Sequence, residues 1–261
     1  MNLNSIKSDL YAKERNQIFQ YLKDSNCAGA SSVNDPKENT LVFVKTVGFY
    51  DKLIKNAESK SIKKVFLILE EGLKERKNKS ILLIKTSEYA ELLFAEYHNS
   101  IEYNGCSNVI SDASFIHPSA VVGITGLWIR KTPEQKVIKM KHIGNVVIED
   151  NVYVDACTTI HRGTFGSTII RKNTLLSCHI NVGHNCDIGE NCFIGPLVGI
   201  GGSTKIGNNV NIWQGAMIRN GIQICDNVVI GMGSVVTKDV TISGTYVGSP
   251  ARLISDNMIN V

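Results

Sequence analysis

The chain has 261 residues, a net charge of +4 and 43% hydrophobic residues. This length and apolar content fit one large or two modest globular domains, and the charge is too small to argue for nucleic-acid binding. The first residues lack the apolar core of a secretory signal, and no run of about 18 apolar residues predicts a membrane span. Seven cysteines without a CxxC pair indicate reduced thiols and a cytoplasmic protein.

The first hundred residues alternate between strand and helix patterns. We expect a helix within residues 5–24, and then strands and amphipathic helices in alternation. The strands are predicted at residues 41–46, 63–69 and 80–86, and the helices at residues 48–59 and 88–100. Such a pattern predicts a small α/β domain over residues 1–105, with a boundary near Asn104-Gly105.

A six-residue repeat organises the C-terminal half. Every sixth residue from Ile170 is a branched aliphatic, and a glycine often follows it. The thirteen positions are Ile170, Leu176, Val182, Ile188, Ile194, Ile200, Ile206, Ile212, Ile218, Ile224, Ile230, Val236 and Ile242. A period of six fits a short strand and a tight turn, and three such sides make a coil of eighteen residues whose aliphatics stack into one core. The pattern resembles that of hexapeptide-repeat proteins, and this resemblance implies a left-handed parallel β-helix.

The repeat continues upstream with two breaks. Ile148, Val154 and Ile160 share one phase, and four extra residues then occur around residues 163–166. Residues 128–147 do not fit the repeat, so we expect them to leave the β-helix as a loop or hairpin. The predicted β-helix domain covers residues 106–254, and residues 255–261 form a tail.

Four stretches resemble UDP-3-O-acylglucosamine N-acyltransferase, an enzyme of lipid A synthesis. Two of them, NTLVFVKTVGFYDKL and GNVVIEDNVYVDACTTIHRG, resemble the family's uridine-binding segment and the entry into its β-helix. The other two, HINVGHNCDIG and VGIGGSTKIG, resemble its catalytic segments. The four stretches lie at residues 39–53, 144–163, 179–189 and 198–207.

The resemblance implies roles for individual residues. His184 falls on the family's general base, and Gly202 on a glycine whose backbone N–H serves as oxyanion donor. Phe43 and Phe49 fall on the aromatic positions that contact the base, and Thr46 stands where the family commonly has asparagine. Gly202 follows His184 by eighteen residues, so we expect the two to be neighbours on adjacent coils.

N-acylation of an amino sugar requires a neutral amine, a donor for the developing oxyanion and two substrates held in reach. A histidine with a pKa near ~6.5 can accept the amine proton at neutral pH. Asp187 and Glu190 are close enough in sequence to orient His184. The alternatives are that His184 is merely structural, or that it assists without being essential, since water or the product thiolate can also accept the proton.

Further residues are candidate ligands of the two substrates. His161, Arg162 and Asn181 are expected to contact the sugar or its phosphates, although a solvated turn explains the first two equally well. CoA-dependent relatives bind pantetheine and the 3′-phosphate end at positions that correspond to Gly231, Gly233, Ser234, Lys238 and Arg252. The glycines also suit ordinary turns, and the two cations are expected phosphate contacts.

Two departures separate the chain from the lipid A enzyme. IRNGIQI (218–224) lacks a second histidine, and the chain stops soon after YVGSPARLI (246–254) without the helical extension that engages acyl carrier protein. A VGSPAR-like ending resembles hexapeptide transferases that use acyl-CoA. We therefore predict an acyl-CoA-dependent N-acyltransferase of a nucleotide-linked amino sugar for surface glycans. The Asn-to-Thr change at Thr46 alters a base-edge contact and leaves dTDP open as the nucleotide. We favour a dTDP sugar such as dTDP-4-amino-4,6-dideoxyglucose, with a 3-amino sugar as the alternative, because a lipid A substrate would require the missing carrier-protein segment.

Three alternatives stay open. The first is the lipid A N-acyltransferase itself, with acyl carrier protein as donor. The second is a zinc enzyme of the γ-carbonic anhydrase type, because His179 and His184 have its five-residue spacing and His142 lies close to the third position. The transferase interpretation, by contrast, expects no metal. The third alternative is a non-catalytic scaffold. The resemblance implies a homotrimer with active sites between subunits.

Overall fold

A computed structural model describes residues 3–69, 73, 78–84, 89–103 and 106–257. Contacts divide the chain into two compact units. The N-terminal unit comprises Met1–Tyr103 and Leu127–Lys141, and the β-helix unit comprises Asn104–Gly126 and His142–Val261. The expected boundary near Asn104-Gly105 falls on residues outside the described part of the chain. None of the described helices combines the length and apolar character needed to cross a membrane.

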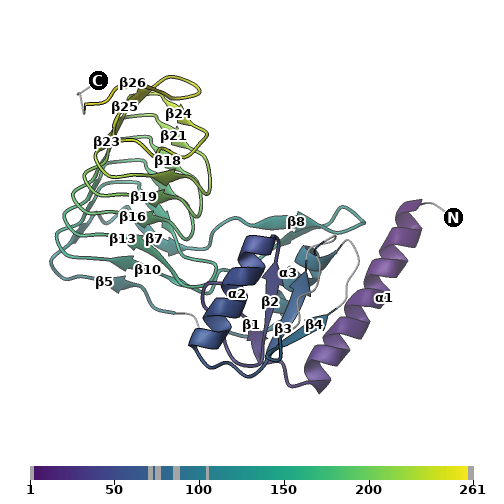
Figure 1. The fold of residues 1–261 in the computed structure, drawn as a ribbon. Helices are drawn as coiled ribbons and strands as arrows, with labels where there is room; N and C mark the ends of the chain where they lie inside the picture. The colour runs from purple at the N-terminus through teal and green to yellow at the C-terminus, as the bar shows by residue number, and fades with distance from the viewer. Residues whose placement is uncertain (1–2, 70–72, 74–77, 85–88, 104–105, 258–261) are drawn as a thin grey trace. The chain divides into compact units, whose positions relative to one another are not determined.

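The N-terminal unit is an α/β structure, as predicted. Its parallel sheet has the order β1-β2-β3-β4 (Figure 1). The strands are β1 (Gly29–Ala30), β2 (Thr40–Val44), β3 (Val65–Leu69) and β4 (Ile81–Ile84). The helices are α1 (Leu3–Asp24), α2 (Val47–Ser59) and α3 (Ala90–Ser100). Residues 85–88, where we expected the end of a strand and the start of a helix, lie outside the described residues.

The core of this unit forms where the amphipathic α2 covers the sheet. α2 buries Tyr50, Leu53 and Ala57, and they share one hydrophobic cluster with Val42 and Leu67 of β2 and β3. The 3.6-residue period of a helix explains why these three α2 residues share a face.

The β-helix unit is a left-handed parallel β-helix of hexapeptide coils, as predicted (Figure 1). Over the described part of the chain its short strands form three sheets, called the first, second and third sheet below. The first sheet has the order β22-β19-β16-β13-β10-β5, the second β26-β25-β23-β20-β17-β14-β11-β6, and the third β24-β21-β18-β15-β12-β7. Each regular coil therefore contributes one strand to each sheet.

The strand bounds follow the six-residue step. The first sheet contains β5 (Val109–Ile110), β10 (Asn145–Ile148), β13 (Ser167–Ile170), β16 (Asp187–Ile188), β19 (Lys205–Ile206) and β22 (Gln223–Ile224). The second contains β6 (Phe115–Ile116), β11 (Tyr153–Val154), β14 (Leu175–Leu176), β17 (Phe193–Ile194), β20 (Asn211–Ile212), β23 (Val228–Ile230), β25 (Gly244–Val247) and β26 (Arg252–Ser255). The third contains β7 (Val121–Ile124), β12 (Thr159–His161), β15 (Asn181–Val182), β18 (Gly199–Ile200), β21 (Met217–Ile218) and β24 (Val235–Val236).

The repeat aliphatics form the core of the β-helix. From Ile170 to Val236 every one of them is buried, and each such residue contributes about 1.5–3 kcal/mol by leaving water. The prediction for the last position, Ile242, is wrong, because its side chain is 57% exposed. Val240 takes its place, since it is buried and pairs with Ile224 in a parallel bridge. The regular step therefore ends two residues early.

Asparagines form a ladder along one corner of the β-helix. Asn151, Asn173, Asn191, Asn209 and Asn227 all have a φ between 56° and 59°, a left-handed conformation that asparagine tolerates better than most residues. The Nδ2 of Asn173 donates to Oδ1 of Asn191 over 3.1 Å, and Asn209 donates likewise to Asn227 over 3.3 Å. The ladder fixes the turn between the first and second sheets in successive coils.

The two expected breaks have different structures. The four extra residues lengthen one coil, so that Ile148 pairs with Ile170 and the step is 22 residues rather than eighteen. The expected insertion contains a hairpin of β8 (Ile129–Lys131) and β9 (Val137–Lys139). This hairpin packs on α3 of its own unit, where Arg130 forms an ion pair with Glu91.

The C-terminal coil ends in an antiparallel strand. β25 continues the second sheet in parallel with β23, and β26 then pairs with β25 in the opposite direction. Gly244 permits this close approach, because a Cβ atom at this residue would overlap the carbonyl oxygen of Ser255.

Candidate functional site

His184 lies at the corner between the third and first sheets. β15 ends at Val182, β16 begins at Asp187, and the imidazole of His184 is half-buried between them. The residues two positions after the buried aliphatic of the third sheet form one column along this corner, since each sheet strand pairs in register with the next. This corner column consists of Arg162, His184, Gly202, Asn220 and Lys238.

Gly202 is directly beside the imidazole of His184, as the eighteen-residue spacing predicted. A Cβ atom built on Gly202 would lie 2.6 Å from His184 Nε2, so only glycine leaves room for the ring in this position. Gly183 must also be glycine, because a Cβ atom there would overlap the backbone nitrogen of Gly202. Among the described residues the Gly202 N–H has no hydrogen-bond acceptor. The corner therefore combines an imidazole nitrogen with a backbone N–H that has no acceptor among the described residues.

The other ring nitrogen of His184 faces polar groups of the same unit. Nδ1 lies 3.1 Å from Oδ1 of Asn185 and 3.4 Å from Oγ1 of Thr164. Thr164 belongs to the four extra residues of the lengthened coil, and sequence reasoning missed both contacts. No local motif marks them, because only the register of the coils brings Thr164 beside His184.

His142 closes one side of the imidazole. Its ring centroid is 5.0 Å from that of His184 with an interplanar angle of 68°, and its side chain is buried. Gly126 packs against both, because a Cβ atom there would lie 2.6 Å from His142 Nε2 and 3.0 Å from His184 Cβ. His142 therefore contacts the imidazole of His184, and these are two of the three histidines that the zinc alternative uses. In the described residues, however, no group of three or more His, Cys, Asp or Glu side chains is placed to hold a metal ion.

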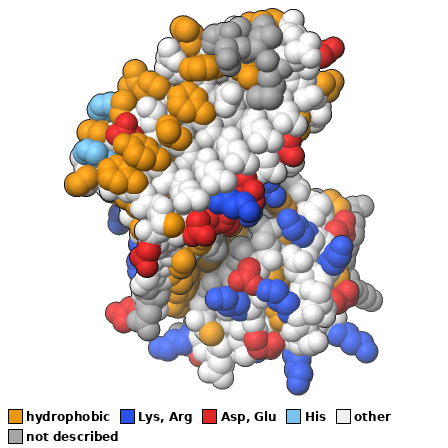
Figure 2. All heavy atoms as spheres, turned by 90° about the vertical axis from the view of Figure 1, so that its left-hand side faces the viewer, with side chains coloured by type: hydrophobic (Ala, Val, Ile, Leu, Met, Phe, Trp, Pro, Cys, Tyr) orange, Lys and Arg blue, Asp and Glu red, His pale blue; other side chains and the backbone are white. Residues whose placement is uncertain are grey.

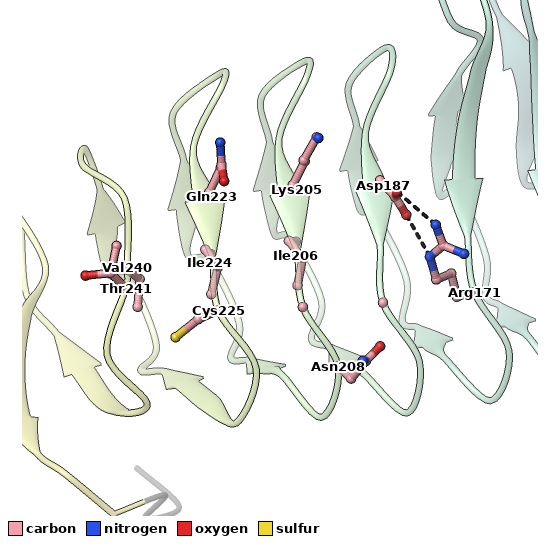
Figure 3. A pocket seen from close by; sticks show the side chains of 12 residues that line it. Arg171, Asp187, Lys205, Ile206, Asn208, Gln223, Ile224, Cys225, Val240 and Thr241 are labelled. Atoms are coloured by element: carbon pink, nitrogen blue, oxygen red, sulfur yellow. Dashed lines mark hydrogen bonds and ion pairs between the residues drawn. The ribbon is translucent and has the colours of Figure 1, made fainter.

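The two acids next to His184 in sequence have other partners. Asp187 accepts two hydrogen bonds from Arg171, from Nε over 2.9 Å and from Nη2 over 3.0 Å, and this pairing raises the pKa of Arg171. Glu190 forms an ion pair with Lys172, with 3.6 Å between Oε2 and Nζ. The expectation that Asp187 or Glu190 orients His184 is therefore wrong. Asp187 instead lines an open depression of about 490 Å³ on the first sheet, where Lys205 and Gln223 follow it on the neighbouring strands (Figure 3).

The candidate sugar ligands are engaged within the third sheet. His161 Nε2 lies 3.0 Å from Asn181 Oδ1, and its Nδ1 lies 3.2 Å from the carbonyl oxygen of Thr125. The Nε of Arg162 donates to the carbonyl oxygen of Gly123 over 2.7 Å. His161 and Asn181 are on neighbouring strands, and Asn181 is three residues before His184.

The candidate CoA ligands are of two kinds. Lys238 in the corner column and Arg252 on β26 are exposed cations. Ser234 is fully buried, and its Oγ accepts the N–H of Gly248 over 3.1 Å, so its hydroxyl stabilises the turn. Gly231 is buried, and its N–H donates to the carbonyl oxygen of Tyr246. Gly233 has a φ of 65°, which explains the glycine by conformation alone.

The three candidate base ligands lie where β2 passes into α2, within the N-terminal unit. This is the carboxyl edge of a parallel sheet, where α/β proteins commonly bind ligands. Phe43 is half-buried with its ring 6.0 Å from that of Phe94, and Phe49 is 48% exposed. Thr46 caps α2, since its Oγ1 accepts the N–H of Phe49 over 3.3 Å.

Comparisons with known proteins agree with this architecture. Residues 203–238 match the bacterial transferase hexapeptide family of six repeats. A UDP-3-O-acylglucosamine N-acyltransferase of Rhizobium meliloti is 38% identical over 153 residues, which are 59% of this chain and 43% of that protein. The enzyme of the same name from Campylobacter lari is 37% identical over 136 residues, which are 52% and 43% of the two chains. The chain thus spans less than half the length of these curated relatives.

Solved structures are similar over much of the chain at low sequence identity. PerB from Caulobacter crescentus, solved in complex with CoA and GDP-perosamine, is 21% identical, with 77% of this chain and 75% of that chain covered and a TM-score of 0.43. A UDP-N-acetylglucosamine acyltransferase is 18% identical, with 86% and 70% covered and a TM-score of 0.49. Residues 203–238 are thus similar to the hexapeptide repeats of bacterial transferases.

Proposed function

We propose that the chain is an N-acyltransferase that moves an acyl group from acyl-CoA to the amino group of a nucleotide-linked sugar. The observation that carries the proposal is the corner at which His184 Nε2 adjoins Gly202. The sequence similarity to UDP-3-O-acylglucosamine N-acyltransferases supports the same chemistry. All seven cysteines are free thiols, which suits a reaction in the reducing cytoplasm.

The corner offers what the transfer needs. The sugar amine attacks the thioester carbonyl carbon, and the Gly202 N–H donates to the oxyanion that develops there. His184 Nε2 accepts the proton that the amine nitrogen loses as the new C–N bond forms. The tetrahedral intermediate then expels the CoA thiolate, and the imidazolium returns its proton to that sulfur. The products are an amide and free CoA.

The donor is proposed to lie along the corner column. Lys238 stands three coils from His184, and at about 4.8 Å per coil the two backbones are roughly 14 Å apart. An exposed ammonium at this distance suits a phosphate of the CoA, while the thioester reaches Gly202. Arg252 is a second exposed cation for the same group.

The base of the nucleotide is proposed to stack between Phe43 and Phe49. The ring of Phe49 is exposed and can therefore stack on a base. We favour dTDP over UDP because Thr46, where the family commonly has asparagine, has no carboxamide with which to read a base edge, and its Oγ1 caps α2. dTDP-4-amino-4,6-dideoxyglucose is our concrete candidate. The alternative is the lipid A N-acyltransferase, which the names of the relatives favour.

We propose that the active form is a homotrimer. Hydrophobic side chains gather on one part of the β-helix surface (Figure 2). On the second sheet Phe115, Tyr153 and Leu175 form an exposed column, and the first two rings stack 4.8 Å apart. Packing against neighbouring subunits would remove this column from water.

A thiol-release assay tests the function. Acetyl-CoA and longer acyl-CoAs are offered with dTDP-, UDP- and GDP-linked amino sugars, and His184→Ala is measured beside the wild type. We expect release with one sugar and a loss of about 10²-fold or more in the variant. His117→Ala, which removes a histidine from another corner, is the matched control and keeps its activity. If no pair releases thiol but acyl carrier protein donors do, the lipid A alternative is correct.

A further inference from the structure

Asn185 has a role that follows from its contacts with both His184 and the lengthened coil. Resting on the proposed function, we propose that Asn185 is a positioning residue that holds the proton of neutral His184 on Nδ1. This leaves the lone pair on Nε2, the nitrogen beside Gly202. Of the two neutral tautomers, this is the one that can act as a base at the corner.

The orientation of the Asn185 side chain is fixed by backbone groups. Its Oδ1 lies 2.9 Å from the backbone nitrogen of Thr164, which can only donate, and its Nδ2 lies 2.7 Å from the carbonyl oxygen of Phe165, which can only accept. A flipped carboxamide would put two donors together at Thr164 and two acceptors together at Phe165. The identity of each carboxamide atom therefore follows from the backbone.

The carboxamide in turn fixes the imidazole. His184 Nδ1 lies 3.1 Å from Asn185 Oδ1, and this oxygen can only accept. Nδ1 must therefore carry the hydrogen in the neutral ring. Thr164 Oγ1, at 3.4 Å, is a longer contact to the same nitrogen. Nε2 is left without a hydrogen, and it is also the ring atom closest to the Cβ position of Gly202.

The four extra residues of the coil supply the partners of Asn185. Thr164 and Phe165 both lie in this break. The segment just before β10 holds the break in place by hydrogen bonds such as Ile143 N–H to the carbonyl oxygen of Thr164 over 3.0 Å. Gly163 allows the Asn185 carboxamide to lie close to the break, since a Cβ atom at Gly163 would lie 2.7 Å from Asn185 Nδ2. A regular eighteen-residue coil would leave the carboxamide without these two partners.

Asparagine also suits the backbone at this position. Its φ is 59°, and its N–H donates to Thr168 Oγ1 over 2.8 Å. Asparagine tolerates this left-handed conformation, and unlike a carboxylate it adds no charge beside the ring. The carboxamide thus orients the imidazole without placing a second charge beside it.

Nitrogen NMR of the full-length protein tests the tautomer without any need for activity. In ¹⁵N-histidine-labelled wild type at a pH where His184 is neutral, we expect Nδ1 to be protonated and Nε2 unprotonated; His184→Gln assigns the signals. Asn185→Gly keeps the left-handed backbone available and removes the carboxamide, so we expect the Nε2–H tautomer to gain population. A wild-type ring that carries its hydrogen on Nε2 would overturn the proposal, whatever the enzyme acylates.

Kinetics give an independent test once a substrate pair is known. Asn185→Gly should lower kcat by about 10-fold or more while KM changes little. Asn185→Asp keeps an acceptor but places a charge beside the ring, so the acid limb of the pH profile should move up by ~1 unit or more. Asn209→Gly makes the same change at a left-handed residue of the asparagine ladder. This control should leave kcat and the pH profile unchanged. An unmoved profile in Asn185→Asp, with the protein folded, would refute the contact.

Discussion

Replacing Gly202 by alanine tests the geometry of the corner most directly. The added Cβ atom would lie 2.6 Å from His184 Nε2, 2.8 Å from Cδ2 and 3.0 Å from Cε1, whereas ordinary contact begins near 3.4 Å. The imidazole must therefore move by about 0.8 Å. A displacement of about 1 Å at a reacting group costs on the order of 10²-fold in rate, so we expect kcat to fall by that factor.

The fold should tolerate the Gly202→Ala substitution. His184 is half-buried rather than enclosed, so its ring can turn away, and the free energy of unfolding should fall by no more than about 1–3 kcal/mol. Gly199→Ala is the matched control, because its Cβ atom would also lie 2.6 Å from a side-chain atom, that of Met217. Met217 is 52% exposed and flexible, so this variant should stay within about 3-fold of wild type. A Gly202→Ala enzyme with wild-type kcat would refute the proposed geometry.

Three further predictions concern other parts of the chain. Phe49→Ala should raise KM for the nucleotide sugar by about 10-fold with kcat nearly unchanged, since stacking of an aromatic ring on a base is worth ~1–3 kcal/mol. Steady-state kinetics measure this change, and an unchanged KM would exclude Phe49 from the base site. Ile194→Ala should lower the free energy of unfolding by ~2–5 kcal/mol, because Ile194 is fully buried; denaturant titration measures this loss, and a change below ~1 kcal/mol would contradict the packing. Burial lowers the pKa of His98 to about 4, so the unfolded chain binds its proton first as the pH falls. Stability should therefore be fully present above pH ~6.5 and fall by about 3 kcal/mol towards pH 4; His98→Gln should show a flatter pH dependence, and an equal slope in both proteins would refute this account.

The fold was largely predictable because the β-helix repeats a local rule. The sequence has a branched aliphatic residue at every sixth position, and from Ile170 to Val236 each of these side chains is buried in the core. The rule failed at Ile242 because Val240 forms the last bridge to Ile224, and nothing in the period marks where a regular repeat stops. The strands and helices of the N-terminal unit were likewise visible as buried runs and amphipathic faces.

The polar contacts of the site were less predictable, because they depend on which coil lies above which. His184 and Gly202 were paired by their spacing alone. Proximity in sequence suggested Asp187 as the orienting acid, yet its strand turns the carboxylate towards Arg171. Asn185 was overlooked because its partner Thr164 lies twenty-one residues earlier, across a break that shifts the register.

The antiparallel pairing of β26 with β25 bears on how copies of the chain meet one another. A parallel β-helix offers open backbone groups at its last coil, and such an edge is a template for further strands. β26 occupies that edge in the second sheet and reverses the chain direction, so a parallel coil of another molecule cannot continue there. Removal of β26 would therefore open the way to end-to-end filaments, visible as slow aggregation without loss of the folded coils.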